Sequence, residues 1–239
     1  MVTEAIPARV FALYKIVTSK KGITRSEAKA MMEPEEIQGN TSYFAAILKA
    51  AVELKLLYEE ESVLIPLPKI ELQNINEFRR FAISKLNMFE KEQFYMVTNL
   101  IVNMDEQIFE YPLSDRELLN LISEQLGTQI TPTMIRGWRF WASFLGFGYE
   151  NQMSFLPNAY VFVKNVLSMI NLERNMEYEM DNFMLRFDQY GKIIDSNLKT
   201  ERNLNLALSS ALRQLHDNKE IELIYRSDAE KRWVLYPSE

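Results

Sequence analysis

Few residues of this sequence have side chains that could carry out catalysis or hold a metal. The chain contains one histidine, His216, and no cysteine, so histidine-based triads, thiolate nucleophiles and ordinary zinc sites lack their components. His216 lies beside Asp217 at the end of a predicted helix, where a histidine commonly interacts with the last carbonyl groups. We therefore expect no catalytic, metal-ligating or cofactor-binding residue, and a protein that is not an enzyme.

Carboxylates and glycines form no catalytic pattern either. Glutamates gather within residues 33–36 and 177–179, in polar segments typical of turns and helix starts, where we expect a solvated face. The seven glycines are scattered. The pair Gly146 and Gly148 does not open a helix with the lysine and serine or threonine of a phosphate-binding loop.

Basic residues could contact nucleic acid only on a local face. The net charge of −6 and the pI near 5.1 argue against coating of DNA by global positive charge, because contacts with phosphates supply most non-specific affinity. In helix-turn-helix proteins the third helix presents its outward side chains to bases and phosphates. The candidate DNA-contacting residues on such helices and their wings are Arg136, Arg139, Arg202, Asn205, Ser209, Arg213, Arg226, Lys231 and Arg232. Solvated helix faces, and salt bridges from the arginines to acidic segments, would give the same pattern.

Three successive segments could position these residues, because each repeats helices followed by two short strands around a turn. We place these modules at residues 1–70, 71–158 and 159–239. The predicted fold is mostly α with short β wings, a tandem array of winged-helix (helix-turn-helix) modules. The last module begins with an apolar helix at 158–171, interpreted as a connector packed against the second module. It ends in a hairpin over 221–225 and 232–236, the strongest wing signal in the chain.

The three modules differ in what their surfaces offer. In the first, the third helix presents Lys49 and the wing carries three glutamates, residues 59–61, which would repel phosphate; this module is interpreted as structural or protein-binding. In the second, Ser114 and Glu117 form a predicted capping box. The aromatic residues between Trp138 and Phe147 are expected to be mainly core, with Phe140 or Phe144 as an exposed edge for a partner.

The sequence shows no stretch of about 20 apolar residues that a membrane helix needs. Its first residues, Met-Val-Thr-Glu-Ala-Ile-Pro, lack the basic and apolar regions of a signal peptide. We therefore expect a cytoplasmic protein without membrane partners.

Two stretches of the second module resemble a known family. Residues 135–149, Ile-Arg-Gly-Trp-Arg-Phe-Trp-Ala-Ser-Phe-Leu-Gly-Phe-Gly-Tyr, and 155–158, Phe-Leu-Pro-Asn, resemble the central motif of winged-helix accessory proteins in bacterial phage-defence clusters, the DpdG-like proteins. The segments Pro-Ala-Arg-Val at 7–10 and Ala-Ala-Val-Glu-Leu-Lys-Leu-Leu at 50–57 are similar in kind. The resemblance covers most of the chain. It implies a non-enzymatic subunit that works beside nucleases or ATPases, and it assigns no catalytic residues.

These expectations describe a non-catalytic adaptor of a prokaryotic anti-phage defence complex, either associated with DNA or assembling proteins. Its expected partners are other subunits of the complex, a nuclease or an ATPase, together with double-stranded DNA where the basic faces are used. Two alternatives stay open. One is a kite-like accessory subunit of an SMC-type ATPase complex, in which protein contact replaces DNA contact, and the other is a winged-helix transcription regulator.

Overall fold

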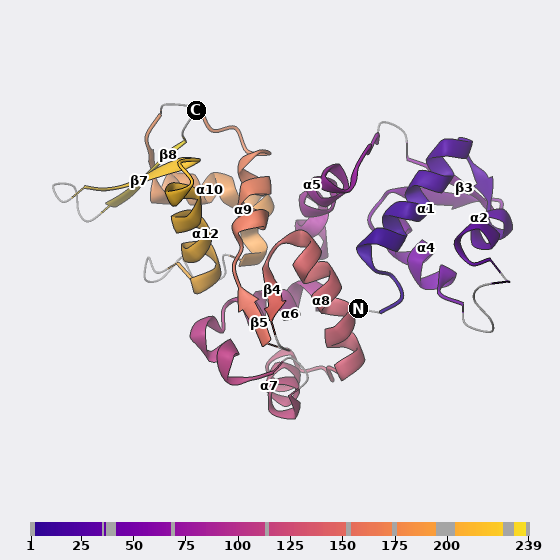
Figure 1. Ribbon diagram of the computed structural model, residues 1–239, viewed down its shortest axis with the longest axis horizontal. Helices are drawn as coiled ribbons and strands as arrows, with labels where there is room; N and C mark the ends of the chain where they lie inside the picture. Colours follow the sequence, from indigo (N-terminus) through magenta and orange to yellow (C-terminus); the bar gives the residue numbers. More distant parts are fainter. Residues whose placement is uncertain are drawn as a thin grey trace. The chain divides into compact units, whose positions relative to one another are not determined.

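The computed structural model is mostly helical with three small antiparallel sheets, as the sequence predicts (Figure 1). It describes residues 3–34, 36, 42–67, 70–112, 115–151, 154–173, 176–194, 204–226 and 232–237, with backbone alone for 225–226 and 232–237. No helix in these ranges is long and apolar enough to cross a membrane. The chain divides into two compact units, residues 1–82 with 133–141 and residues 83–132 with 142–239.

The first segment packs three helices against a three-stranded sheet. Its elements in chain order are α1 (Pro7–Lys20), β1 (Ile23–Thr24), α2 (Arg25–Met32), α4 (Phe44–Glu53), β2 (Leu57–Glu60) and β3 (Val63–Pro66). The strand order is β1-β3-β2, so the last strand is central. The sequence predicted the helices and the hairpin β2–β3 but not β1, because two residues are too few to show a strand period.

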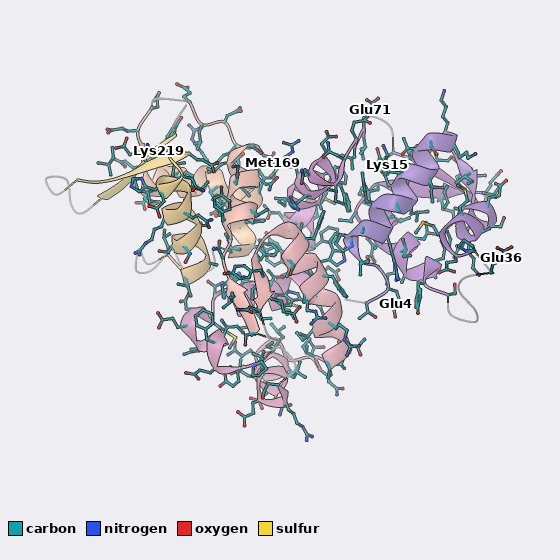
Figure 2. All side chains as sticks on the ribbon, in the orientation of Figure 1. Glu4, Lys15, Glu36, Glu71, Met169 and Lys219 are labelled. Carbon is teal, nitrogen blue, oxygen red and sulfur yellow. The ribbon has the colours of Figure 1, made fainter. Side chains whose placement is uncertain are left out.

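The core of this segment lies between α1 and α4. Tyr14 on α1 is fully buried, and its hydroxyl donates to the Ile70 carbonyl at 2.7 Å and accepts from the Leu72 amide at 3.2 Å. Lys15, labelled in Figure 2, donates to the Leu72 carbonyl at 3.4 Å. These bonds fix the chain that follows β3 against α1, because they satisfy backbone groups that no strand pairs.

The middle segment has more helix and less sheet. Its elements are α5 (Ile75–Lys85), η1 (Leu86–Phe89), α6 (Gln93–Val102), η2 (Asp105–Glu110), α7 (Arg116–Leu126), α8 (Pro132–Leu145), β4 (Gly148–Asn151) and β5 (Ser154–Pro157). The hairpin β4–β5 pairs Gly148 with Pro157 and Asn151 with Ser154. The N-cap of α7 is Asp115, whose carboxylate accepts from the Glu117 amide at 2.6 Å. The predicted cap, Ser114, lies outside the described residues.

The last segment repeats the order of the first. It comprises α9 (Tyr160–Leu167), β6 (Tyr178–Glu179), α10 (Met180–Gly191), η3 (Lys192–Ile194), α12 (Leu206–Asp217), β7 (Ile221–Arg226) and β8 (Arg232–Pro237). The strand order is β6-β8-β7, again with the last strand central. The predicted terminal hairpin is confirmed, and Figure 1 shows it in yellow beyond the end of α12.

Helix α9 is more than the connector that the sequence suggested. Its Phe162 ring does contact Phe147 of the middle segment, with centroids 4.6 Å apart. It also meets Phe187 of α10 edge-on at 6.5 Å, and α9 packs along α12 and α10. The predicted packing against the second module is thus present at Phe147, and α9 also occupies the place in the last segment that α1 has in the first.

A small polar cluster attaches α9 to the turn between α12 and β7. The Glu220 carboxylate accepts from the Tyr160 hydroxyl at 2.6 Å and from the Lys164 ammonium at 2.9 Å. Burial acts to raise the pKa of Glu220, but the hydrogen bonds from Lys164 and Tyr160 together hold that pKa below its ordinary value. The cluster thus favours the ionised carboxylate and fixes the start of the hairpin.

The aromatic residues of α8 do not form one core. Trp138 is fully buried, as the sequence predicts, but it belongs to the first unit with residues 1–82. Trp141 is half-buried, donates its indole N–H to the Ala5 carbonyl at 2.8 Å, and meets the Phe78 ring edge-on at 6.2 Å. The expectation of a single second-module core is therefore wrong for Trp141, whose partners come from the N-terminal residues and α5.

Trp138→Ala should lower the free energy of unfolding by about 3–5 kcal/mol, because it leaves a cavity where a fully buried indole stood. Trp141→Phe is the matched control. It keeps most of the aromatic contact but loses one hydrogen bond, worth about 1 kcal/mol. Urea denaturation measures both, and an unchanged stability of Trp138→Ala would contradict the buried position.

Candidate functional site

Helix α12 and its N-cap carry three of the residues for which a DNA contact was predicted, Asn205, Ser209 and Arg213, and the structure gives them different roles. Arg213 is exposed and Ser209 is half-buried. Asn205 is the N-cap of the helix. Arg202 and Lys231 lie outside the described residues. The structure therefore leaves Arg213 and Ser209 on the surface of the second unit but places Asn205 in a network of hydrogen bonds.

Every polar atom of the Asn205 side chain has a partner. Its Oδ1 accepts from the Leu208 amide at 2.9 Å, which caps α12. Its Nδ2 donates to the Ile194 carbonyl at 2.6 Å and to Asn103 Oδ1 at 2.9 Å. An asparagine that reads a base must offer both its oxygen and its nitrogen to that base. Asn205 is committed instead to positioning α12.

The contacts around Asn205 continue into the middle segment. Asn103 donates to the Asn99 carbonyl at 2.7 Å, and Asn99 donates to the Ile193 carbonyl at 2.9 Å. The Asp105 carboxylate accepts from the Leu206 amide at 2.7 Å, so a negative charge already occupies the N-terminus of α12, where the helix dipole favours an anion. The first turn of α12 is thus bonded to Asn103 at the C-cap of α6 and to Asp105 of η2.

The wing of the last segment keeps two arginines opposite each other. The register of β7 and β8 ends with Arg226 paired to Arg232. Both positions lie in the second unit with Arg213.

The two predicted arginines of α8 belong to the first unit. Arg136 is exposed, and Arg139 is half-buried, with its guanidinium 5.6 Å from the centre of the Phe140 ring. Phe140 is 38% exposed, so the predicted aromatic edge is present there. Phe144 is half-buried.

A groove of about 500 Å³, which the sequence did not suggest, lies in the second unit. It is bounded by η2, the hairpin β4–β5 and the first turns of α12. Phe109, Tyr149, Leu156, Pro157 and Leu206 line it with apolar surface, and Glu106 supplies its carboxylate. In the sequence only Phe109, an aromatic residue among the acidic residues of 105–110, could have indicated this groove. The other lining residues have the types expected at wing and helix positions.

The histidine and the glutamates that the sequence analysis considered for catalysis or metal binding have structural roles or are exposed. Nδ1 of His216 accepts from the Leu223 amide at 3.2 Å, so this histidine binds the first strand of the hairpin rather than helix carbonyls. Glu33 is buried and accepts from the Ser42 hydroxyl at 2.9 Å and from the Tyr43 amide, which corrects the expectation of a solvated face there. Within the described ranges no three histidine, aspartate or glutamate residues are grouped to hold a metal ion.

Comparison with known proteins yields one family. The model of the family described as DpdG-like matches residues 1–229. No curated protein and no solved structure matches the chain.

Asn205→Ala should lower the free energy of unfolding by about 2 kcal/mol, because it removes the helix cap and two donated hydrogen bonds. Asn205→Ser should cost about half as much, since the serine hydroxyl can still cap the helix. Urea denaturation followed by far-UV circular dichroism measures both. A variant with unchanged stability but weakened DNA binding would instead identify Asn205 as a contact to bases.

Proposed function

Because the chain belongs to the DpdG-like family, we propose that it is a non-catalytic subunit of a prokaryotic anti-phage defence complex. Its role is to hold protein partners together through tandem winged-helix modules. The repeated element order supports these modules: helix, short strand, two helices and a hairpin occur in the first and last segments with the same strand order. That order, with the last strand central, is typical of winged helices.

The hydrogen bonds already made at the N-terminus of α12 are the observation that supports protein contacts rather than reading of duplex DNA. In helix-turn-helix proteins the N-terminal residues of the recognition helix contact base edges. Here that turn is occupied by Asn205 and Asp105, and Glu106 lies beside it in the groove. A major groove edge approaching this turn would meet carboxylates and backbone groups that are already bonded.

The first module also favours protein contacts. On its wing, Glu59 accepts from the Arg25 guanidinium at 3.2 Å, with the glutamate side chain 30% exposed. Glu60 and Glu61 are exposed beside it. On α4, Lys49 is paired with Glu53 at 3.7 Å. These ion pairs are weak in water, but they leave the wing with more negative than positive charge.

Purification of the tagged full chain from its native host should recover a nuclease or ATPase subunit in fixed proportion. The complex should survive digestion of nucleic acid, because the proposed contacts are between proteins. The isolated chain should show no nuclease or ATPase turnover. Recovery of an SMC-type ATPase would support the kite-like alternative, and a chain that purifies alone while binding one promoter sequence would be a transcription regulator.

Contact with DNA through the last wing is a second candidate function, favoured by the Arg226–Arg232 pair and the exposed Arg213. Arginine binds phosphate through charge-assisted hydrogen bonds, and both register positions lie on the hairpin predicted as a wing. Such contact would add to the adaptor role, since phosphate contacts hold a protein on DNA without reading its sequence.

Reversing the charge of Arg213 and Arg232 to glutamate should weaken binding to duplex DNA. The dependence of log affinity on log salt should fall by about one to two units of slope. Replacement of Glu59, Glu60 and Glu61 by lysine should strengthen binding, because it removes repulsion from the first wing. Fluorescence anisotropy at several salt concentrations measures both, and a chain without salt-sensitive binding would eliminate DNA as a partner.

A further inference from the structure

The groove between η2, β4–β5 and α12 presents apolar side chains that the described residues of the second unit leave partly exposed. Tyr149 and Leu156 are opposite each other in the hairpin register, and both face the groove together with Leu206 of α12 and Phe109 of η2. Tyr149 is 54% exposed and Phe109 is 47% exposed. Half-exposed aromatic rings beside aliphatic side chains are the composition of the centres of protein interfaces.

The groove is held open by rigid elements rather than by loose chain. Its α12 wall is fixed by the Asn205 cap and by the bond from the Leu206 amide to Asp105. Its hairpin wall is fixed by four consecutive residue pairs between β4 and β5. A preformed site loses little conformational entropy when a partner inserts a side chain.

Charge decides what kind of segment fits this groove. Among the residues that the structure describes, Glu106 is the one charged residue lining the groove, and the other polar lining residues, Asn158 and Ser210, are neutral. The acidic Asp105 and the exposed Glu110 belong to the same short helix, η2. Within the described ranges no lysine or arginine lines the groove, so the Glu106 carboxylate attracts a cationic segment here and repels phosphates.

We propose that this groove binds a segment of a protein partner that inserts an aliphatic or aromatic side chain and flanks it with lysine or arginine. The proposal rests on the adaptor function and names the surface that performs it. The inserted side chain lies between Phe109 and the Tyr149–Leu156 pair, and the flanking cation faces Glu106. Single-stranded nucleic acid, which also stacks on aromatic rings, is disfavoured by the carboxylates.

A displayed library of random short peptides, selected on the full-length protein, tests this specificity without knowledge of the partner. The selected peptides should combine an apolar side chain with lysine or arginine. The variant Phe109→Ser/Tyr149→Ser should bind them at least about tenfold more weakly, because each ring is an anchor. Glu106→Lys should weaken the binding of the basic peptides about severalfold.

Leu185→Ser is the matched control, because Leu185 is a large apolar residue on α10 that is 71% exposed and lies outside the groove. It should leave peptide affinity unchanged. Circular dichroism should show that all variants keep the fold of the wild type. Selection of no peptides, selection of acidic peptides, binding that the double variant retains, or competition by an oligothymidylate would each overturn the proposal.

The native complex separates this inference from the proposed function. If a nuclease or ATPase subunit co-purifies with the wild type and with Leu185→Ser but is lost from Phe109→Ser/Tyr149→Ser, both stand. If the double variant retains that subunit, the adaptor function stands and the groove is not its docking surface. If the wild type recovers no such subunit, the adaptor function itself fails, whatever the peptides show.

Discussion

The carboxamide of Asn205 holds α12 in place, and the surface of the second unit depends on it. Its oxygen caps the helix while its nitrogen reaches Ile194 and Asn103. The carboxylate of Asp105 completes the same turn. Helix α12 is therefore attached to α6 and η2 by polar contacts made by residues about 100 positions earlier in the chain. This attachment gives Asn205 and the Leu206 amide bonded partners, and the apolar groove lies beside them.

The sequence predicted those parts of the fold that local patterns determine. Helical spacing of apolar residues identified α1, α4, α8 and α12, and the alternation in 221–225 and 232–236 identified the last hairpin. The sequence predicted the packing of α9 on the second module but not its packing within the last segment, because an apolar helix can pack on either neighbour; here it contacts both Phe147 and Phe187. The strands β1 and β6 were missed, since a two-residue strand exists only through its pairing with a distant strand.

The candidate site was less predictable, because its parts meet only in three dimensions. Asn205 and Arg213 both lie on the polar side of a helix, and no local feature shows that Asn205 has a partner at Asn103. The groove combines residues from 106–109, 149–158 and 206–210, of which only Phe109 is unusual in its own sequence context. Wing and helix charges could be read directly from the sequence, which is why the acidic character of the first wing was anticipated.

The distribution of tryptophans makes the two units distinguishable in solution. Trp138 and Trp141 belong to the first unit, and the third tryptophan of the chain, Trp233, lies on β8 in the second. Intrinsic tryptophan fluorescence therefore reports mainly on the surroundings of α8, where one indole is fully buried and the other is bonded to a backbone carbonyl. The far-UV circular dichroism signal of the helices instead comes from both units. If the two signals change at different denaturant concentrations, the units unfold separately, and one free energy does not describe the whole chain.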